Sequence, residues 1–150
     1  MRVIIQRVSQ AKVEIEGEVA GQIGSGFAIL LGIEEADGLD DVNWLCGKIS
    51  KMRIFGDDEG KMNRSLMDVD GEVLVISQFT LHASTKKGNR PSFIKSARPD
   101  HAMPLYEAFK KEMSQQIGKS VASGRFGAEM QVTLTNDGPV TITMDSQNRE

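Results

Sequence analysis

The sequence has one cysteine, two histidines and no long hydrophobic run. Cys46 alone cannot form an internal disulfide, and so few sulfur and imidazole groups do not make a cysteine-rich zinc site. No segment approaches the roughly 18 apolar residues that a membrane-spanning helix needs, and the first residues lack the hydrophobic segment of a signal peptide. We therefore expect a cytoplasmic protein that uses no metal and no cofactor and does not associate with membranes.

Several common catalytic motifs are also missing. The chain contains no Walker phosphate loop, no GxGxxG motif after a strand, no HExxH and no GxSxG. The glycine-rich run 21–26 has no helix after it, so it predicts a turn between two strands. The usual nucleotide-binding, zinc-peptidase and α/β-hydrolase sites are thereby excluded.

The chain has the size and the pattern of one α+β domain. Its 150 residues are 39% hydrophobic and 26% charged, which is typical of a single globular domain spanning residues 1–150. Two continuous apolar runs, 27–33 and 73–76, predict central strands, and alternation predicts strands near both ends. Apolar residues at three- and four-residue spacing predict helices from Leu39 and from Pro99 to Gly118. We expect two main helices and largely antiparallel sheets.

Charge is distributed unevenly along the chain. The net charge is −3, but residues 73–99 contain no acid and five basic residues, so the remainder carries −8. The five are Lys86, Lys87, Arg90, Lys95 and Arg98. All five fall in the polar segment 82–98, which we expect to be a long loop that attracts phosphate groups. The alternative is an ordinary solvated loop.

The segment Ser77-Gln78-Phe79-Thr80 follows a buried strand, so its side chains should emerge at the end of that strand. No carboxylate lies beside the two hydroxyls to activate them. If this segment is catalytic, backbone N–H groups or the substrate itself must therefore provide most of the catalysis. Two alternatives stay open: the hydroxyls satisfy local backbone groups, or Thr80 is a nucleophile with His82 as its base. We expect the other histidine, His101, to be a solvated surface residue.

A second unusual segment is Asn136-Asp137-Gly138-Pro139, between two alternating stretches. Asp-Gly in this position is typical of a hairpin. The proline that follows removes a backbone donor and fixes φ, so we expect a rigid hairpin turn. A cis bond between Gly138 and Pro139 is an open alternative.

Taken together, four segments resemble the D-aminoacyl-tRNA deacylases: residues 1–8 (MRVIIQRV), 77–81 (SQFTL), 87–93 (KGNRPSF) and 136–141 (NDGPVT). The resemblance extends from residue 1 to about residue 146 in order and spacing. It implies a barrel-like or sandwich-like fold, a homodimer, and hydrolysis of the ester between a D-amino acid and the 3′-terminal adenosine of tRNA. Such an enzyme serves translation quality control.

The resemblance also implies roles for individual residues. Ser77, Gln78, Phe79 and Thr80 would build the catalytic pocket, with the N–H groups of Phe79 and Thr80 stabilising the oxyanion and the 2′-hydroxyl of the tRNA assisting.

The remaining implied roles concern specificity and binding. Gly138 and Pro139, joined by a cis bond and held by Arg7, would enter the active site of the partner subunit. There they would act as a chiral filter that rejects L-amino acids. The filter would accept glycine, including glycine mischarged on tRNA-Ala. Lys86, Lys87 and Arg90 would bind the acceptor stem. A non-catalytic RNA-binding module is the alternative function.

Overall fold

Strand β1 (Arg2–Ile15) is the centre of the sheet in the computed structural model, which describes residues 1–149. The first half of β1 pairs with β3 (Gly26–Gly32) and the second half with β2 (Glu18–Ile23), both antiparallel. Strand β8 (Gln131–Asp145) pairs with the other edge of β1. Beyond β3 the sheet continues through β6 (Glu72–Ser77) and the short β7 (Ala122–Ser123), and these pairings are parallel.

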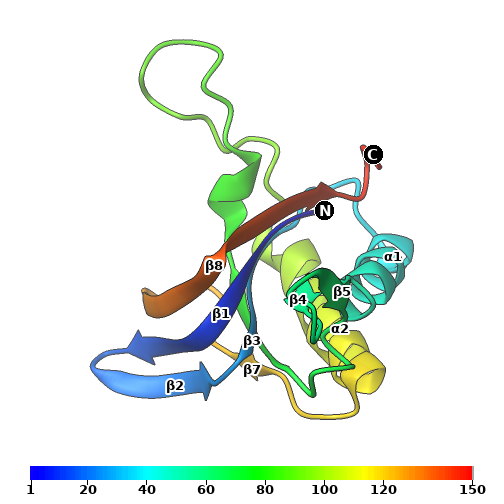
Figure 1. Cartoon of the computed structure of the whole chain (residues 1–150). Helices are drawn as coiled ribbons and strands as arrows, with labels where there is room; N and C mark the ends of the chain where they lie inside the picture. The colour runs from blue at the N-terminus through cyan, green and yellow to red at the C-terminus, as the bar shows by residue number, and fades with distance from the viewer. Residues whose placement is uncertain (150) are drawn as a thin grey trace.

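The sheet curls until strand β2 comes close to strand β7 (Figure 1). At the point of approach β2 carries Gly21, where a Cβ atom would lie 2.9 Å from the carbonyl oxygen of Ser123 in β7. One apolar cluster fills the inside of this curve, and a second, larger one lies between the sheet and the helices. The fold is therefore α+β with a barrel-like, largely antiparallel sheet, as predicted.

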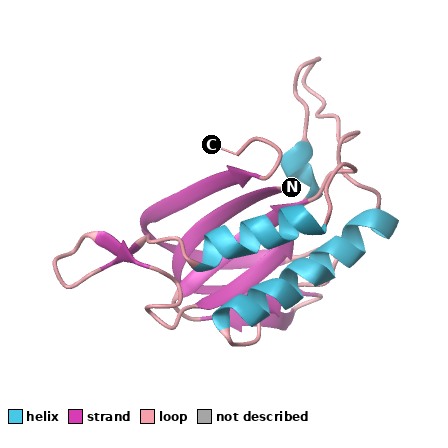
Figure 2. Cartoon of the chain, turned by 90° about the vertical axis from the view of Figure 1, so that its right-hand side faces the viewer, coloured by secondary structure: helices cyan, strands magenta, loops and turns pink. Residues whose placement is uncertain are grey.

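Two helices lie side by side against one face of the sheet (Figure 2). The first, α1 (Leu39–Ser50), buries the stripe that contains Val42, Leu45 and Ile49. The second, α2 (Pro99–Ile117), has proline at its first position and ends at Gly118, whose φ of 70° is left-handed. Both helices agree with the sequence prediction. In residues 1–149 no helix combines the length and the apolarity needed to span a membrane.

Two short elements were not predicted. Strands β4 (Phe55–Gly56) and β5 (Met62–Arg64) form a separate two-stranded arm, where the sequence indicated only a turn and an irregular stretch. A 3-10 helix, η1 (Phe79–His82), follows β6 at once.

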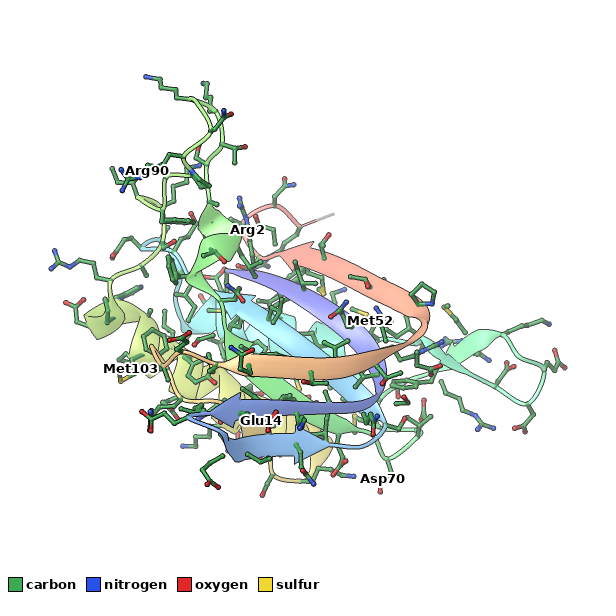
Figure 3. The ribbon with its side chains drawn as sticks, turned by 90° about the vertical axis from the view of Figure 1, so that its left-hand side faces the viewer. Arg2, Glu14, Met52, Asp70, Arg90 and Met103 are labelled. Carbon is green, nitrogen blue, oxygen red and sulfur yellow. The ribbon has the colours of Figure 1, made fainter. Side chains whose placement is uncertain are left out.

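The predicted hairpin at 136–139 is wrong. Both halves of β8 pair with β1 rather than with each other, so the chain does not reverse there. Val8 pairs with Asn136 and Gln6 with Thr141, so the four residues 137–140 of β8 lie opposite the single residue Arg7 of β1 and form a bulge. The β1–β8 pair bends at this bulge (Figure 3). The sequence suggested a hairpin because the pairing with β1 spans more than 120 residues and leaves no local signal.

Candidate active site

The strand pair β3–β6 ends where the candidate site begins. Ser77 pairs with Leu31, and the N–H of Gln78 donates to the carbonyl oxygen of Leu31 at 2.8 Å. The next residue of β3, Gly32, lies directly under η1: a Cβ there would come within 2.9 Å of Leu81 and 3.0 Å of the Gln78 carbonyl oxygen. Sequence reasoning missed Gly32, whose only signal is a glycine within an otherwise bulky apolar run.

The turn that carries the predicted catalytic residues is held from three sides. Inside it, the N–H groups of Leu81 and Ala83 donate to the carbonyl oxygens of Gln78 and Thr80. From outside, the Ser96 hydroxyl donates to the Phe79 carbonyl at 2.8 Å and Arg2 donates to the Leu81 carbonyl at 3.3 Å.

The N–H groups of Phe79 and Thr80 are the first two of the short helix, so no intrahelical acceptor exists for them. Within residues 1–149 they also have no other acceptor. These two donors are therefore available to a ligand.

A cavity of about 610 Å³ opens beside this turn. Ser77, Gln78 and Phe79 line one side, and Phe126 and Met130 lie among the other lining residues. Thr80 is not part of the lining.

Phe93 and Ser96, at the base of the basic segment, also line the cavity. The Phe93 ring meets Phe79 edge-on, with 5.2 Å between centroids. Phe79 is 58% exposed, so an aromatic surface faces solvent at the mouth of the cavity.

The hydroxyl of Thr80 is not paired with a base. It accepts a hydrogen bond from the side-chain amide of Gln78. His82 is buried, and neither ring nitrogen has a hydrogen-bond partner within the described chain. Its Nδ1 lies 4.0 Å from Glu34 Oε2. The geometry therefore lacks the nucleophile–base bond that a Thr80–His82 hydrolase requires.

One group of side chains in residues 1–149 has the composition of a metal site: Glu34, Asp37 and His82 place one potential ligand atom each within 4.8 Å of one another. Both oxygens of Asp37 are already engaged, however. Oδ1 accepts from the buried α-ammonium of Met1 and from Gln147, and Oδ2 accepts from the N–H of Glu34. The cluster is thus built around an ammonium group and fits a metal ion poorly.

The second histidine differs from its prediction. His101, in the first turn of α2, is half-buried and hydrogen-bonds from Nε2 to the Asp37 carbonyl at 3.0 Å. The sequence suggested a solvated residue because the loop that holds Asp37 is more than 60 positions away.

Lys86, Lys87 and Arg90 lie on a loop that extends away from the body of the molecule, above η1 (Figure 1; Arg90 is labelled in Figure 3). A pair of hydrogen bonds between Ser84 and Ser92 closes its base. The three side chains are exposed and form no ion pair with any residue of the described chain. Within residues 1–149, this is the only long loop that carries such a positive charge and also contributes lining residues to the cavity.

The bulge of β8 carries Gly138 and Pro139, both exposed and joined by a cis bond. Two contacts from Arg7 hold it: Nε donates to the Asp137 carbonyl at 3.0 Å and lies 3.4 Å from the Asp137 carboxylate. Asn136 fixes the other side by accepting from the N–H of Val140 at 3.0 Å.

One chain does not bring the two predicted parts of the site together. Arg7 pairs with Phe27, whereas the cavity begins at Leu31, four residues further along β3. Four residues of strand span about 13 Å. In Figure 3 the bend of β8 lies on the side of the β4–β5 arm, opposite Met103 at the start of α2.

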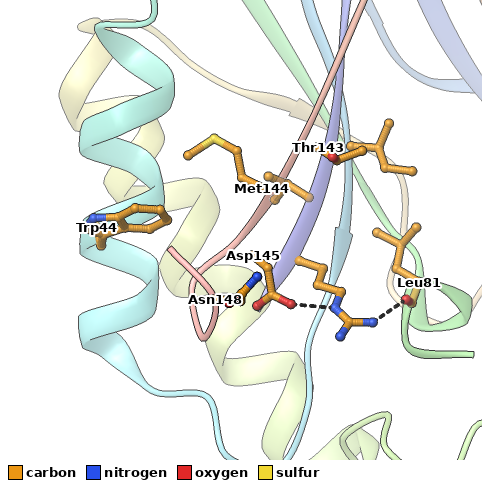
Figure 4. Close-up of a pocket in the computed structure, with 9 residues that line it drawn as sticks. Trp44, Leu81, Thr143, Met144, Asp145 and Asn148 are labelled. Atoms are coloured by element: carbon orange, nitrogen blue, oxygen red, sulfur yellow. Dashed lines mark hydrogen bonds and ion pairs between the residues drawn. The ribbon is translucent and has the colours of Figure 1, made fainter. Parts of the chain in front are cut away.

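A smaller cavity of about 380 Å³ lies beside η1, whose Leu81 lines it (Figure 4). Arg2, Leu81 and Asp145 line it, and Arg2 Nε donates to Asp145 at 2.7 Å. Burial works to raise the pKa of Asp145, but hydrogen bonds from Arg2 and from the N–H of Gln147 hold it below its usual 3.8. Because Arg2 also donates to the Leu81 carbonyl, its side chain links the end of β8 to η1.

Known proteins resemble this chain over its whole length. Curated D-aminoacyl-tRNA deacylases from Akkermansia muciniphila and Flavobacterium johnsoniae are 63% and 61% identical over 150 residues, covering all of both chains. A solved structure described as c-Myc DNA Unwinding Element Binding Protein has a TM-score of 0.90 at 37% identity and covers 97% of this chain and 98% of its own.

A second solved structure, described as a probable eukaryotic D-amino acid tRNA deacylase, has a TM-score of 0.82 at 18% identity, covers 95% of this chain and 97% of its own, and so supports the fold. The sequence model of the D-Tyr-tRNA(Tyr) deacylase family matches residues 4–145. The chain therefore belongs to this family.

Proposed function

We propose that the protein hydrolyses the ester bond of D-aminoacyl-tRNA and releases the free D-amino acid and the tRNA. The observation that carries this proposal is the turn at Phe79 and Thr80, whose two unused N–H groups stand at the end of β6 beside the 610 Å³ cavity. The family match and the names of the relatives point to the same reaction.

The reaction does not require a catalytic side chain. An aminoacyl ester is already activated, so the main tasks are to position it and to stabilise the oxyanion that forms on its carbonyl oxygen. A single preorganised donor is worth about 2.7–4 kcal/mol in known cases. The N–H groups of Phe79 and Thr80 serve as these donors, and the 2′-hydroxyl of the terminal adenosine assists the attack. The Thr80 hydroxyl, bonded to Gln78, stays out of the chemistry.

The enzyme distinguishes D- from L-aminoacyl groups by steric exclusion. L- and D-aminoacyl groups differ only in the direction of the side chain, and a rigid wall on the L side rejects one of them by clash. Gly138 and Pro139 form this wall in the site of a partner subunit, because they are exposed and lie opposite the cavity of their own chain. The active form is then a homodimer. Glycine has no side chain to clash, so glycyl-tRNA is hydrolysed too.

The basic loop binds the phosphates of the acceptor stem. Lys86, Lys87 and Arg90 are free of internal acids, and the loop joins the cavity through Phe93 and Ser96. With tRNA as its substrate, the enzyme works in the cytoplasm.

The decisive experiment is a deacylation assay. Purified protein should release D-tyrosine from D-tyrosyl-tRNA and leave L-tyrosyl-tRNA intact, and EDTA should not change the rate. Binding of tRNA without release of D-tyrosine would instead establish a non-catalytic RNA-binding module.

A further inference from the structure

The guanidinium of Arg7 joins two segments that are distant in the sequence. On one side it donates from Nε to the Asp137 carbonyl at 3.0 Å, next to the Gly138–Pro139 bond. On the other side its Nη1 donates to the carbonyl oxygen of Ile54, the residue before β4. The Arg7 side chain is 13% exposed, so water competes little for these acceptors.

An aromatic ring backs this arrangement. The Arg7 guanidinium carbon lies over the Phe55 ring, 6.0 Å from its centroid. Phe55 is buried and stacks on Phe27 of β3 at 5.2 Å with 22° between the ring planes. Phe27 is part of the sheet, so the stack ties the first residue of the β4–β5 arm to the sheet at the position where Arg7 leaves β1.

We propose that Ile54 and Phe55 are positioning residues for Arg7, and that the β4–β5 arm thereby sets how strictly the enzyme rejects L-aminoacyl-tRNA. This rests on the proposed role of Gly138 and Pro139 as the chiral filter. Arginine has many rotamers, and a guanidinium that is bound on one side only can swing away. The Ile54 carbonyl and the Phe55 ring remove that freedom.

The effect is expected on selectivity rather than on turnover. Phe55 is remote from the cavity, and a D-aminoacyl group does not press against the filter. An L-aminoacyl group does, so its reaction speeds up when the wall yields. A Cβ on Gly138 would lie 3.0 Å from Arg7 Nη2, which shows that Arg7 stands directly behind the wall.

The test uses three variants. Phe55→Leu removes the ring and keeps an apolar side chain, Phe55→Tyr keeps the ring, and Phe109→Leu removes a buried ring of α2 from the same core without touching Arg7. We expect Phe55→Leu to lower the ratio of D- to L-tyrosyl-tRNA hydrolysis about three- to tenfold, the range of a partly desolvated cation–aromatic contact. The ratio should fall because the L rate rises. Phe55→Tyr should keep the wild-type ratio, and Phe109→Leu should lower the melting temperature without changing the ratio.

An unchanged ratio in folded Phe55→Leu, or an equal fall in Phe109→Leu, would overturn the proposal. A second measurement does not depend on activity: hydrogen exchange of the Arg7 Nε–H, followed by NMR, should be faster in Phe55→Leu than in wild type and in Phe109→Leu. If wild-type protein releases no D-tyrosine, the proposed function fails, while the exchange measurement still decides whether Phe55 positions Arg7.

Discussion

The side-chain amide of Gln78 donates a hydrogen bond to the hydroxyl of Thr80, two residues away. This bond occupies a lone pair of the hydroxyl oxygen and leaves its proton without a base, since His82 is buried and does not reach it. A threonine nucleophile needs the opposite arrangement, in which a base accepts the hydroxyl proton. The available groups at this turn are the N–H donors of the backbone.

Thr80→Ala is therefore expected to keep its D-tyrosyl-tRNA deacylase rate within about tenfold of wild type, whereas loss of a nucleophile in triad enzymes costs about 10⁴-fold or more. His82→Ala should likewise retain activity, because His82 does not line the cavity and its ring nitrogens form no hydrogen bond with Thr80. Single-turnover rates at saturating enzyme measure both. Inactivity of the two variants, each shown to be folded by circular dichroism, would support the Thr80–His82 hydrolase instead.

Gly138→Ala should damage both the bulge and the selectivity. The φ of Gly138 is +133°, and a Cβ there would lie 2.8 Å from Val140 Cγ2. Such backbone strain costs about 1–3 kcal/mol. We expect a lower melting temperature and a measurable rate on L-tyrosyl-tRNA.

Gly118→Ala is the matched control for this variant. Gly118 also has a positive φ, +70°, but nothing lies within 4 Å of the added Cβ. It should lower stability by about 1 kcal/mol and leave L-tyrosyl-tRNA intact. Equal selectivity in the two variants would argue against a filter at Gly138.

The cations of the basic loop should act on binding and its salt dependence. Each of Lys86→Ala, Lys87→Ala and Arg90→Ala should raise the KM for D-tyrosyl-tRNA and reduce the slope of log affinity against log salt by about 0.7–0.9. The kcat should stay near wild type, because none of the three lines the cavity. Lys111→Ala, on the exposed face of α2, is the control and should change neither quantity. A kcat effect without a change in slope would contradict a phosphate-binding role.

The sequence predicts the parts of this fold whose signals are local. The three- and four-residue spacing of Val42, Leu45 and Ile49 comes from one helix face, and Pro99 with Gly118 marks the limits of α2. The strand end at Ser77 is equally local, because a continuous apolar run stops there.

Pairings over long distances could not be predicted in this way. Asn136–Pro139 has the composition of a hairpin, but its conformation is decided by pairing with β1 and by the bond from Arg7. The same holds for His101, whose acceptor is the Asp37 carbonyl, and for Phe55, whose neighbours Arg7 and Phe27 come from two other strands. The sequence motifs predict which residues form the candidate site, but they do not predict which residues hold these in place.

Cys46 should be unreactive in the folded protein. Burial, with a smaller effect of the Glu112 carboxylate, raises the pKa of the Cys46 thiol to about 12. At about pH 8 only on the order of one molecule in 10⁴ then carries the reactive thiolate. We expect no reaction with Ellman's reagent over the time in which the urea-unfolded chain reacts fully. Stoichiometric labelling of the native protein would show that α1 opens readily.

The ion pair between Arg2 and Asp145 gives a stability that depends on pH. The pKa of Asp145 is lower in the folded protein than its ordinary 3.8, so folding favours the carboxylate. The contribution is therefore complete above the unfolded value and is lost as the pH falls through the folded pKa. Because the Arg2 side chain is 40% exposed, we expect the ion pair to contribute only about 0.5–1 kcal/mol to the free energy of unfolding.

Urea unfolding of wild type and Asp145→Asn should differ by this amount near neutral pH, and the difference should shrink as the pH falls below about 4. Glu14→Gln, which breaks the half-buried pair with Lys12 on β1, is the control and should cost less at neutral pH, because Asp145 also accepts a hydrogen bond from the N–H of Gln147. A difference that grows with falling pH would show that the folded protein does not favour the charged form.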